Sequence, residues 1–286
     1  MLDAIGYEES NSLEHMEASG LAVRKQIAVG RVVFGGAESI VIAGPCSVEG
    51  RAQVIETAIA VRNAGASMLR GGAFKPRTSP HSFQGLGKEG LVLLREAGDI
   101  SGLPVVTEVM SEDDIPLVCE YSDMIQTGAR NMQNFALLKK LAKCGMPILF
   151  KRGLAATISE WLSAAEYLLQ GGNSDVVLCE RGIRSYDPAL RNCLDIGSVA
   201  LVREMTDLPL VVDPSHATGK RSLIAPVSRA ALAVGADGLI IEVHPHPESA
   251  LSDKEQQLDF REFEELMSNL KLPVLRNQTV PYQRAA

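Results

Sequence analysis

Five cationic side chains follow short apolar runs that lie far apart in the sequence. They are Arg70, Lys75, Arg130, Lys151 and Arg181. Arginine offers a planar fork of N–H donors and lysine a compact charge, so a group of this kind suits phosphate or carboxylate ligands. Each cation alone is more simply explained as a solvated surface charge. Their repeated position after an apolar run favours one shared anion-binding site.

The segment 69–80, LRGGAFKPRTSP, adds a loop whose composition suits a phosphate group. Its two glycines allow close approach of the backbone, and its two prolines stiffen the chain. Further donors at its centre are Arg77, Thr78 and Ser79. An ordinary loop would explain the glycines or a proline alone, but not glycines, cations and hydroxyls together.

A second group of residues has the chemistry of a metal site. It consists of Cys46 in IAGPC, His216 in DPSH, Glu242 in IEVH and Asp253 in ALSD. Sulfur, nitrogen and oxygen donors together suit Mn²⁺, Fe²⁺, Co²⁺ or Zn²⁺ better than Mg²⁺ or Ca²⁺. Taken singly, each residue has an ordinary role, as a buried thiol, a hydrogen-bonded imidazole, a surface carboxylate or a helix cap. The spacing alone does not establish a metal site.

The elements that would bring both groups together alternate along the chain from about Ser39. Short apolar or β-branched runs predict eight strands, at 40–43, 67–70, 104–108, 124–127, 147–151, 176–180, 210–213 and 239–243. Helical patterns lie between them, at 51–63, 90–100, 134–144, 159–169, 197–205 and 221–234. Repeated βα units predict an α/β fold of the (β/α)₈ TIM-barrel type. Active sites of such barrels lie at the carboxyl ends of the strands, where both groups of residues would meet.

The length of the chain fits one such barrel. Its 286 residues are 46% hydrophobic, and a barrel takes roughly 250 residues. We predict an N-terminal extension at 1–38, the catalytic barrel at 39–275 and a C-terminal tail at 276–286. Within the extension, RVVFGG at 31–36 is typical of a strand entering a turn and predicts a short hairpin that caps the bottom of the barrel.

Charge and cysteine content exclude several classes of protein. The 28 Lys and Arg against 35 Asp and Glu give a net charge of -7, which argues against a nucleic-acid-binding surface. No apolar run approaches the roughly 18 residues of a membrane span, and the acidic first residues do not resemble a signal peptide. The five cysteines contain no CxxC pair and suit a reducing compartment, so we expect a soluble, cytoplasmic protein.

These motifs together resemble the type I 3-deoxy-D-arabino-heptulosonate 7-phosphate (DAHP) synthases, in particular the subgroup similar to 3-deoxy-D-manno-octulosonate 8-phosphate synthase. The resemblance spans about residues 41–260 and is carried, in order, by IAGPCSVEG, LRGGAFKPRTSP, QGLGKEGL, TEVM, IQTGARNMQN, ILFKRG, ERGIRSY, VVDPSHATGKR and IEVHPHPESALSDKEQQL. It implies a transferase that condenses phosphoenolpyruvate with erythrose 4-phosphate and water, giving DAHP and phosphate. This reaction is the first step of the shikimate pathway to the aromatic amino acids.

The resemblance also implies roles for the candidate residues. A divalent metal ion would be held by Cys46, His216, Glu242 and Asp253. Phosphoenolpyruvate would be bound by Arg70, Lys75, Glu108, the Ala129 backbone, Arg130, Lys151 and Arg181. The phosphate of erythrose 4-phosphate would be bound by Arg77 and Thr78. Catalytic candidates are Lys75 as proton donor to the new hydroxyl, and Glu108 and His216 for the attacking water. The family implies a homo-oligomer, either a tetramer or a dimer.

Two features depart from the family pattern. The extension is too short for an attached regulatory domain, because an independent domain needs at least about 50 residues. His81 stands where an aromatic residue is expected after the TSP turn.

Three other functions fit part of the pattern. An octulosonate synthase would use arabinose 5-phosphate, but its loop carries Ala-Asn where this chain has only Pro76 between the two cations. A Schiff-base aldolase would use Lys151, but arginine-rich surroundings suit anion binding better. A barrel that only senses sugar phosphates would bind phosphoenolpyruvate without releasing phosphate.

Overall fold

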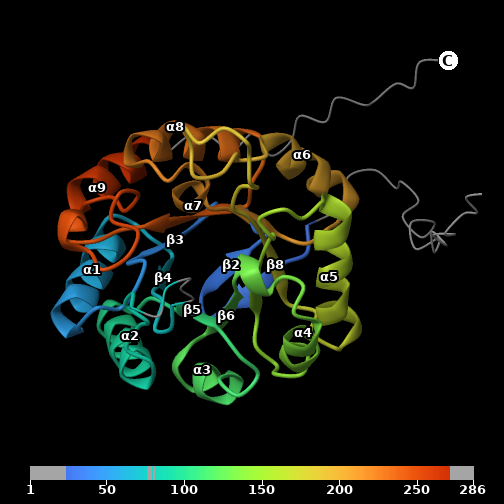
Figure 1. The fold of residues 1–286 in the computed structure, drawn as a ribbon, viewed down its shortest axis with the longest axis horizontal. Helices are drawn as coiled ribbons and strands as arrows, with labels where there is room; N and C mark the ends of the chain where they lie inside the picture. The colour runs from blue at the N-terminus through green and yellow to red at the C-terminus, as the bar shows by residue number, and fades with distance from the viewer. Residues whose placement is uncertain (1–23, 76–78, 80, 271–286) are drawn as a thin grey trace, which may run out of the picture.

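Eight short strands of buried, mostly aliphatic residues close into a parallel barrel in the computed structural model, which describes residues 24–75, 79 and 81–270 (Figure 1). In order around the barrel they are β3 (Ile40–Gly44), β4 (Met68–Arg70), β5 (Val105–Val109), β6 (Met124–Thr127), β7 (Ile148–Lys151), β8 (Val176–Glu180), β9 (Leu210–Val212) and β10 (Gly238–Glu242). Strand β10 pairs in parallel with β3 and closes the ring. The predicted barrel is confirmed, and each predicted strand end lies within one residue of the observed one.

Helices cover the outside of the ring, namely α1 (Arg51–Asn63), α2 (Lys88–Ser101), α3 (Ile115–Tyr121), α4 (Phe135–Leu141), α5 (Ile158–Gln170), α6 (Ile196–Met205), α8 (Arg221–Ala233) and α9 (Phe260–Asn269). The short helix α7 (Pro214–Thr218) and the 3-10 turns η2 (Ala129–Asn131) and η3 (Pro247–Ser249) follow the carboxyl ends of β9, β6 and β10. The start of α5 shows how the sequence fixes a helix end. The Thr157 side chain accepts from the Glu160 backbone N–H, and the Glu160 side chain accepts from the Thr157 backbone N–H. This reciprocal cap satisfies two backbone donors that a helix start leaves free.

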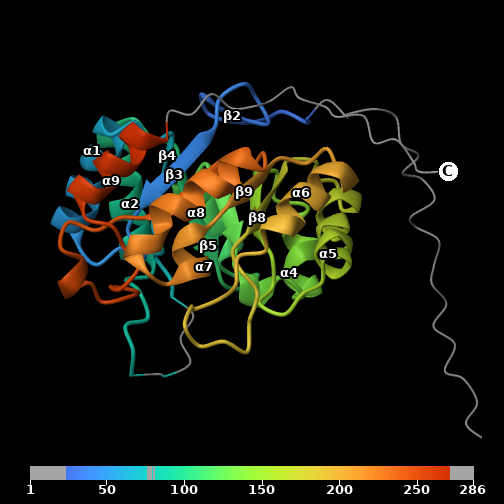
Figure 2. The same ribbon diagram turned by 90° about the horizontal axis from the view of Figure 1, so that it is seen from above.

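A two-stranded hairpin closes the amino-terminal end of the barrel. It consists of β1 (Ile27–Val29) and β2 (Val32–Phe34), paired antiparallel, and it lies at the end opposite the long loops (Figure 2). Because alternate residues of a strand face the same side, each strand buries its first and third residue. Those residues join inward-facing barrel residues such as Met68 and Leu149 in one apolar cluster. Residues 1–23 and 271–286 lie outside the described part, so the limits of the extension and the tail remain predictions.

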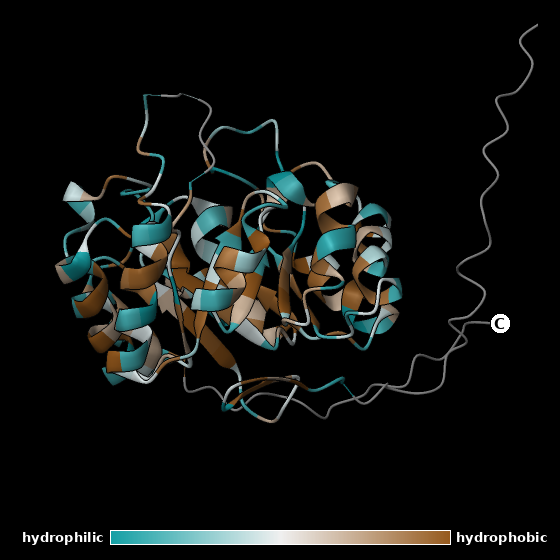
Figure 3. Ribbon diagram, turned by 90° about the horizontal axis from the view of Figure 1, so that it is seen from below, coloured by the Kyte–Doolittle hydropathy of each residue, from teal (hydrophilic) through white to brown (hydrophobic). Residues whose placement is uncertain are grey.

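Apolar side chains form two layers that hold the strands rigidly. One cluster fills the barrel interior, and a larger one lies between the strands and the surrounding helices. Figure 3 colours most of the barrel strands as hydrophobic. Trp161 of α5 is fully buried in the outer layer. Rigid strands matter here because the polar side chains at their carboxyl ends inherit fixed positions.

Candidate active site

A cavity of about 290 Å³ opens at the carboxyl ends of the barrel strands, away from the hairpin. All residues predicted to bind phosphoenolpyruvate line it, namely Arg70, Lys75, Glu108, Ala129, Arg130, Lys151 and Arg181. His216 and Asp253 of the predicted metal group also reach it. Lining residues that the sequence analysis did not single out are Gln126, Gly128, Leu154, Arg184, Arg191 and Asn192. The ERGIRSY stretch, which begins at the last residue of β8, was the available signal for Arg184, since it also contains the predicted Arg181.

Two of the cations are held by buried carboxylates. Arg70 Nη1 lies 2.7 Å from Glu242 Oε1, and Lys151 Nζ lies 2.6 Å from Asp213 Oδ2. All four side chains are almost fully buried. These ion pairs fix the direction of each cation, which a solvated surface charge would lack.

Two cationic groups in the cavity are only partly compensated by the described residues. In residues 24–75, 79 and 81–270, Arg181 forms no ion pair; its side chain is buried and donates to the Gly182 carbonyl at 3.3 Å. Burial lowers the pKa of Arg181, which reflects the cost of holding this charge away from water. The buried Nε of Arg70 also lacks a hydrogen-bond partner within the described residues. An anion in the cavity would balance the charge of Arg181 and give Arg70 Nε an acceptor.

The Glu108 carboxylate borders the same cavity and is fixed from two sides. Gln126 Nε2 donates to Glu108 Oε2 at 3.0 Å. Gly128 leaves the necessary room, since a Cβ atom at this position would lie 2.0 Å from Glu108 Oε1. The glycine is therefore required by close packing against the carboxylate and not by its backbone angles.

We expect Gly128→Ala to reduce kcat roughly fivefold, because the Glu108 side chain must leave its rotamer at a cost of about 1 kcal/mol. Steady-state kinetics of the purified variant would measure this. Gly197→Ala is the matched control, since that glycine is exposed on α6 and an added Cβ meets no atom closer than 3.7 Å. Wild-type kcat in Gly128→Ala would show that the position of Glu108 does not matter.

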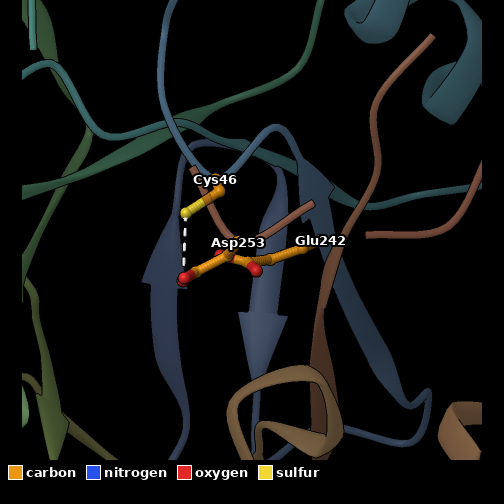
Figure 4. Close-up of side chains that lie close together, drawn as sticks. All are labelled: Cys46, Glu242 and Asp253. Atoms are coloured by element: carbon orange, nitrogen blue, oxygen red, sulfur yellow. Dashed lines mark hydrogen bonds between the residues drawn. The ribbon is translucent and has the colours of Figure 1, made fainter. Parts of the chain in front are cut away.

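Three potential metal ligands converge beside the cavity. One ligand atom from each of Cys46, Glu242 and Asp253 lies within 4.8 Å of the others, and Cys46 Sγ lies 3.4 Å from Asp253 Oδ2 (Figure 4). His216 borders this group, with Nε2 3.5 Å from Glu242 Oε1 and 3.7 Å from Asp253 Oδ2. Pairing of β10 with β3 explains why Glu242 and the loop of Cys46 are neighbours.

Asp213 sets the orientation of His216. It caps α7 by accepting from the His216 backbone N–H at 2.9 Å, and its other oxygen lies 2.8 Å from His216 Nδ1. Burial opposes ionisation of Asp213, but His216 and Lys151 outweigh it and hold the pKa of this carboxyl well below its usual value. An ionised carboxylate only accepts, so Nδ1 must carry the proton, and in the neutral ring Nε2 is then the nitrogen left to bind a metal. Asp213 was not among the predicted site residues, although it lies in the DPSH motif.

The remaining chemistry of this group also fits a divalent metal. Burial raises the pKa of the Cys46 thiol to about 12, and burial lowers the pKa of the His216 imidazole. A bound cation would favour the Cys46 thiolate, while neutral His216 is already in the form that ligates metals. Lys75 Nζ lies 3.0 Å from Cys46 Sγ and 3.1 Å from its carbonyl oxygen, which places an ammonium group beside the metal group.

Two predicted substrate-binding residues belong to the loop after β4. Arg77 and Thr78 lie outside the described residues. The nearby His81 is exposed, and its backbone N–H donates to Ser79 Oγ at 3.3 Å.

Comparison with known proteins adds a family. Residues 15–274 match the DAHP synthetase I family. The chain is 55% identical over 245 residues to the phospho-2-dehydro-3-deoxyheptonate aldolase of Thermotoga maritima, covering 86% of this chain and 72% of that protein. It is 32% identical over 251 residues to the 2-dehydro-3-deoxyphosphooctonate aldolase of an Azoarcus species, covering 80% of this chain and 88% of that protein.

Solved structures agree with these matches. The crystal structure of the Thermotoga maritima DAHP synthase is similar with a TM-score of 0.84 at 54% identity, over 87% of this chain and 73% of that one. A truncated form of 3-deoxy-D-arabino-heptulosonate 7-phosphate synthase from Thermotoga maritima gives a TM-score of 0.82 at 52% identity, over 87% of this chain and 91% of that one.

Proposed function

The chain belongs to the DAHP synthetase I family, and we propose that its cavity condenses phosphoenolpyruvate with erythrose 4-phosphate, with the help of a divalent metal ion. The reaction is a transfer that forms a C–C bond, consumes water and releases phosphate. It is the first step of the shikimate pathway. The observation that carries the proposal is a cavity lined by converging cations, directly beside a thiol, an imidazole and two carboxylates. Among the described residues, the buried Arg181 forms no ion pair and the buried Arg70 Nε has no hydrogen-bond partner.

We assign the phosphoenolpyruvate subsite to the cationic part of the cavity. Its residues are Arg70, Lys75, Glu108, Ala129, Arg130, Lys151 and Arg181. Arg181 is buried without an ion pair, and Lys151 is held beside it by Asp213. Fixed cations of this kind bind phosphate and carboxylate groups without first having to be ordered.

We assign the metal to Cys46, His216, Glu242 and Asp253, with Mn²⁺, Fe²⁺, Co²⁺ or Zn²⁺ as the candidates. When bound, the ion supplies Lewis-acid polarisation of the aldehyde. Lys75 lies close enough to the group to donate the proton that the new hydroxyl needs. Glu108 faces the cavity and is the stronger candidate for activating water, because Nε2 of His216 is reserved for the metal in this assignment.

Erythrose 4-phosphate is the proposed second substrate, with its phosphate on Arg77 and Thr78. The octulosonate synthases are the second candidate, because they match this chain across most of its length. The much higher identity to a heptonate aldolase favours the four-carbon aldehyde.

The proposed function is tested by phosphate release from phosphoenolpyruvate, with erythrose 4-phosphate and arabinose 5-phosphate compared side by side. We expect release with erythrose 4-phosphate, loss of activity with a chelator, and recovery when divalent metal is added. A preference for arabinose 5-phosphate would identify an octulosonate synthase. Binding without release under either aldehyde would identify a sugar-phosphate sensor.

A Schiff-base mechanism at Lys151 fits the geometry less well. Its ammonium group contacts the buried Asp213 carboxylate at 2.6 Å, whereas a Schiff base needs a free amine. We therefore expect borohydride with pyruvate to leave the protein unlabelled, as intact mass spectrometry would show.

We also propose that the chain forms a homo-oligomer in the cytoplasm. Exposed aromatic residues support an interface: Phe135 and Tyr167 stack with ring centroids 4.6 Å apart on neighbouring helices. Light scattering should give a dimer or tetramer mass, and a monomer at assay concentration would refute this.

All five cysteines are free, as suits a reducing compartment. Among the described residues, the helices are too short or too polar to cross a bilayer.

A further inference from the structure

Gln256 is a buried amide that joins two proposed metal ligands to a neighbouring loop. Its side chain is only 2% exposed. Nε2 donates to Glu242 Oε2 at 2.6 Å and lies 3.5 Å from Asp253 Oδ2. Oε1 accepts from Arg191 Nη1 at 2.6 Å. The amide thus lies between a cation and two carboxylates.

Arg191 determines which way this amide faces. A guanidinium group only donates and an ionised carboxylate only accepts, so the amide oxygen must face Arg191 and its NH₂ group must face the carboxylates. Arg191 also pairs with Asp253 Oδ2 at 3.1 Å, and its backbone N–H donates to the Thr218 carbonyl at 3.2 Å. The loop after β8 is therefore fixed against α7, the helix that carries His216.

The backbone at Asp253 needs this support. Its φ of 47° is the only positive φ at a non-glycine residue in the described part of the chain. Such a conformation persists where the surroundings hold it in place. The Gln256 backbone N–H donates to the Asp253 carbonyl at 3.2 Å, and the Gln256 side chain ties this turn to Glu242. One residue therefore fixes both the turn and the direction of the neighbouring carboxylate.

We propose that Gln256 is a positioning residue for metal binding, which holds the Glu242 and Asp253 carboxylates in the orientation that the ion requires. This role rests on the proposed metal site. Each oxygen of Glu242 has its own donor, Arg70 on Oε1 and Gln256 on Oε2. A carboxylate held at both oxygens cannot rotate freely, so its side chain loses less conformational entropy when the ion binds.

The test is the dissociation constant for Mn²⁺ alone, measured without substrates by competition with a chromogenic chelator. Gln256→Met preserves the approximate length of the side chain and removes its donor and acceptor. We expect Mn²⁺ binding to weaken by about 10- to 100-fold, which is the usual effect of removing a residue that hydrogen-bonds to a metal ligand. At saturating Mn²⁺, kcat should fall much less. Gln170→Met is the matched control, since Gln170 is exposed at the end of α5, and it should bind as the wild type does.

A second variant covers the case in which Gln256→Met does not fold. Gln256→Asn keeps a buried amide but is one methylene too short to reach Glu242, and it should also weaken Mn²⁺ binding. Wild-type affinity in either folded variant overturns the positioning role, even where Cys46→Ser abolishes binding and so upholds the metal site. If the wild type itself binds no Mn²⁺, the metal site and the positioning role both fail. Weaker binding with an unchanged unfolding temperature supports the proposal.

Discussion

Cys46→Ser should lose metal binding and most activity while the barrel stays folded. The thiol lies among the proposed ligands, 3.4 Å from Asp253 Oδ2, and a serine hydroxyl is a far weaker donor to a transition metal than a thiolate. Loss of a residue that only hydrogen-bonds to a ligand lowers metal affinity by about 10- to 100-fold. Loss of a direct ligand should therefore lower metal affinity by more than about 100-fold. Calorimetric titration with Mn²⁺ and steady-state kinetics measure the two effects.

Cys193→Ser is the matched control for this change. Cys193 is exposed and does not line the cavity, so the variant should bind metal and turn over as the wild type does. Turnover by the wild type that fully resists a strong chelator would contradict the assignment of Cys46.

Arg181→Ala should weaken phosphoenolpyruvate binding and leave erythrose 4-phosphate almost unaffected, whereas Arg77→Ala should do the reverse. Arg181 is buried in the cavity and forms no ion pair within the described residues. Removing a charge-assisted hydrogen bond costs about 1.5 to 3 kcal/mol, so affinity should fall by roughly one to two powers of ten. Calorimetry measures phosphoenolpyruvate binding directly, and kinetics give the apparent affinity for the aldehyde.

Arg229→Ala serves as the control, because this arginine is exposed on α8 and lies away from the cavity. It should change neither affinity. If Arg181→Ala and Arg77→Ala both lost phosphoenolpyruvate binding and spared the aldehyde, the division of the site into two phosphate subsites would be wrong.

The barrel could be predicted because each strand and most helices leave a pattern of apolar residues within a short stretch of sequence. A strand such as β8 (Val176–Glu180) is covered on both faces, so it appears in the sequence as a continuous apolar run. By contrast, α7 has five residues and begins with a proline, which is too short for a helical period to emerge. The first hairpin strand, Ile27–Val29, was also missed, because its three residues form a strand only through pairing with Val32–Phe34.

The residues of the candidate site likewise divide into those that the sequence identifies and those that only the folded structure identifies. Residues such as Arg70 and Glu242 could be singled out because they stand at strand ends and carry chemistry in their own type. Asp213 and Gln256 could not be assigned from sequence, since their roles depend on partners. Asp213 matters through Lys151 and His216, and Gln256 matters through the direction that Arg191 gives its amide. Only the folded chain brings those partners within hydrogen-bonding distance.

The most direct test is a crystal structure of the protein with Mn²⁺ and phosphoenolpyruvate, with the ion located by its anomalous scattering. We predict one strong peak bound by Cys46, His216, Glu242 and Asp253, at about 2.0 to 2.4 Å from each ligand atom. The phosphate of phosphoenolpyruvate should lie on Lys151 and Arg181 in the adjacent cavity. An ion bound elsewhere on the barrel, with this group of side chains empty, would contradict the proposed mechanism.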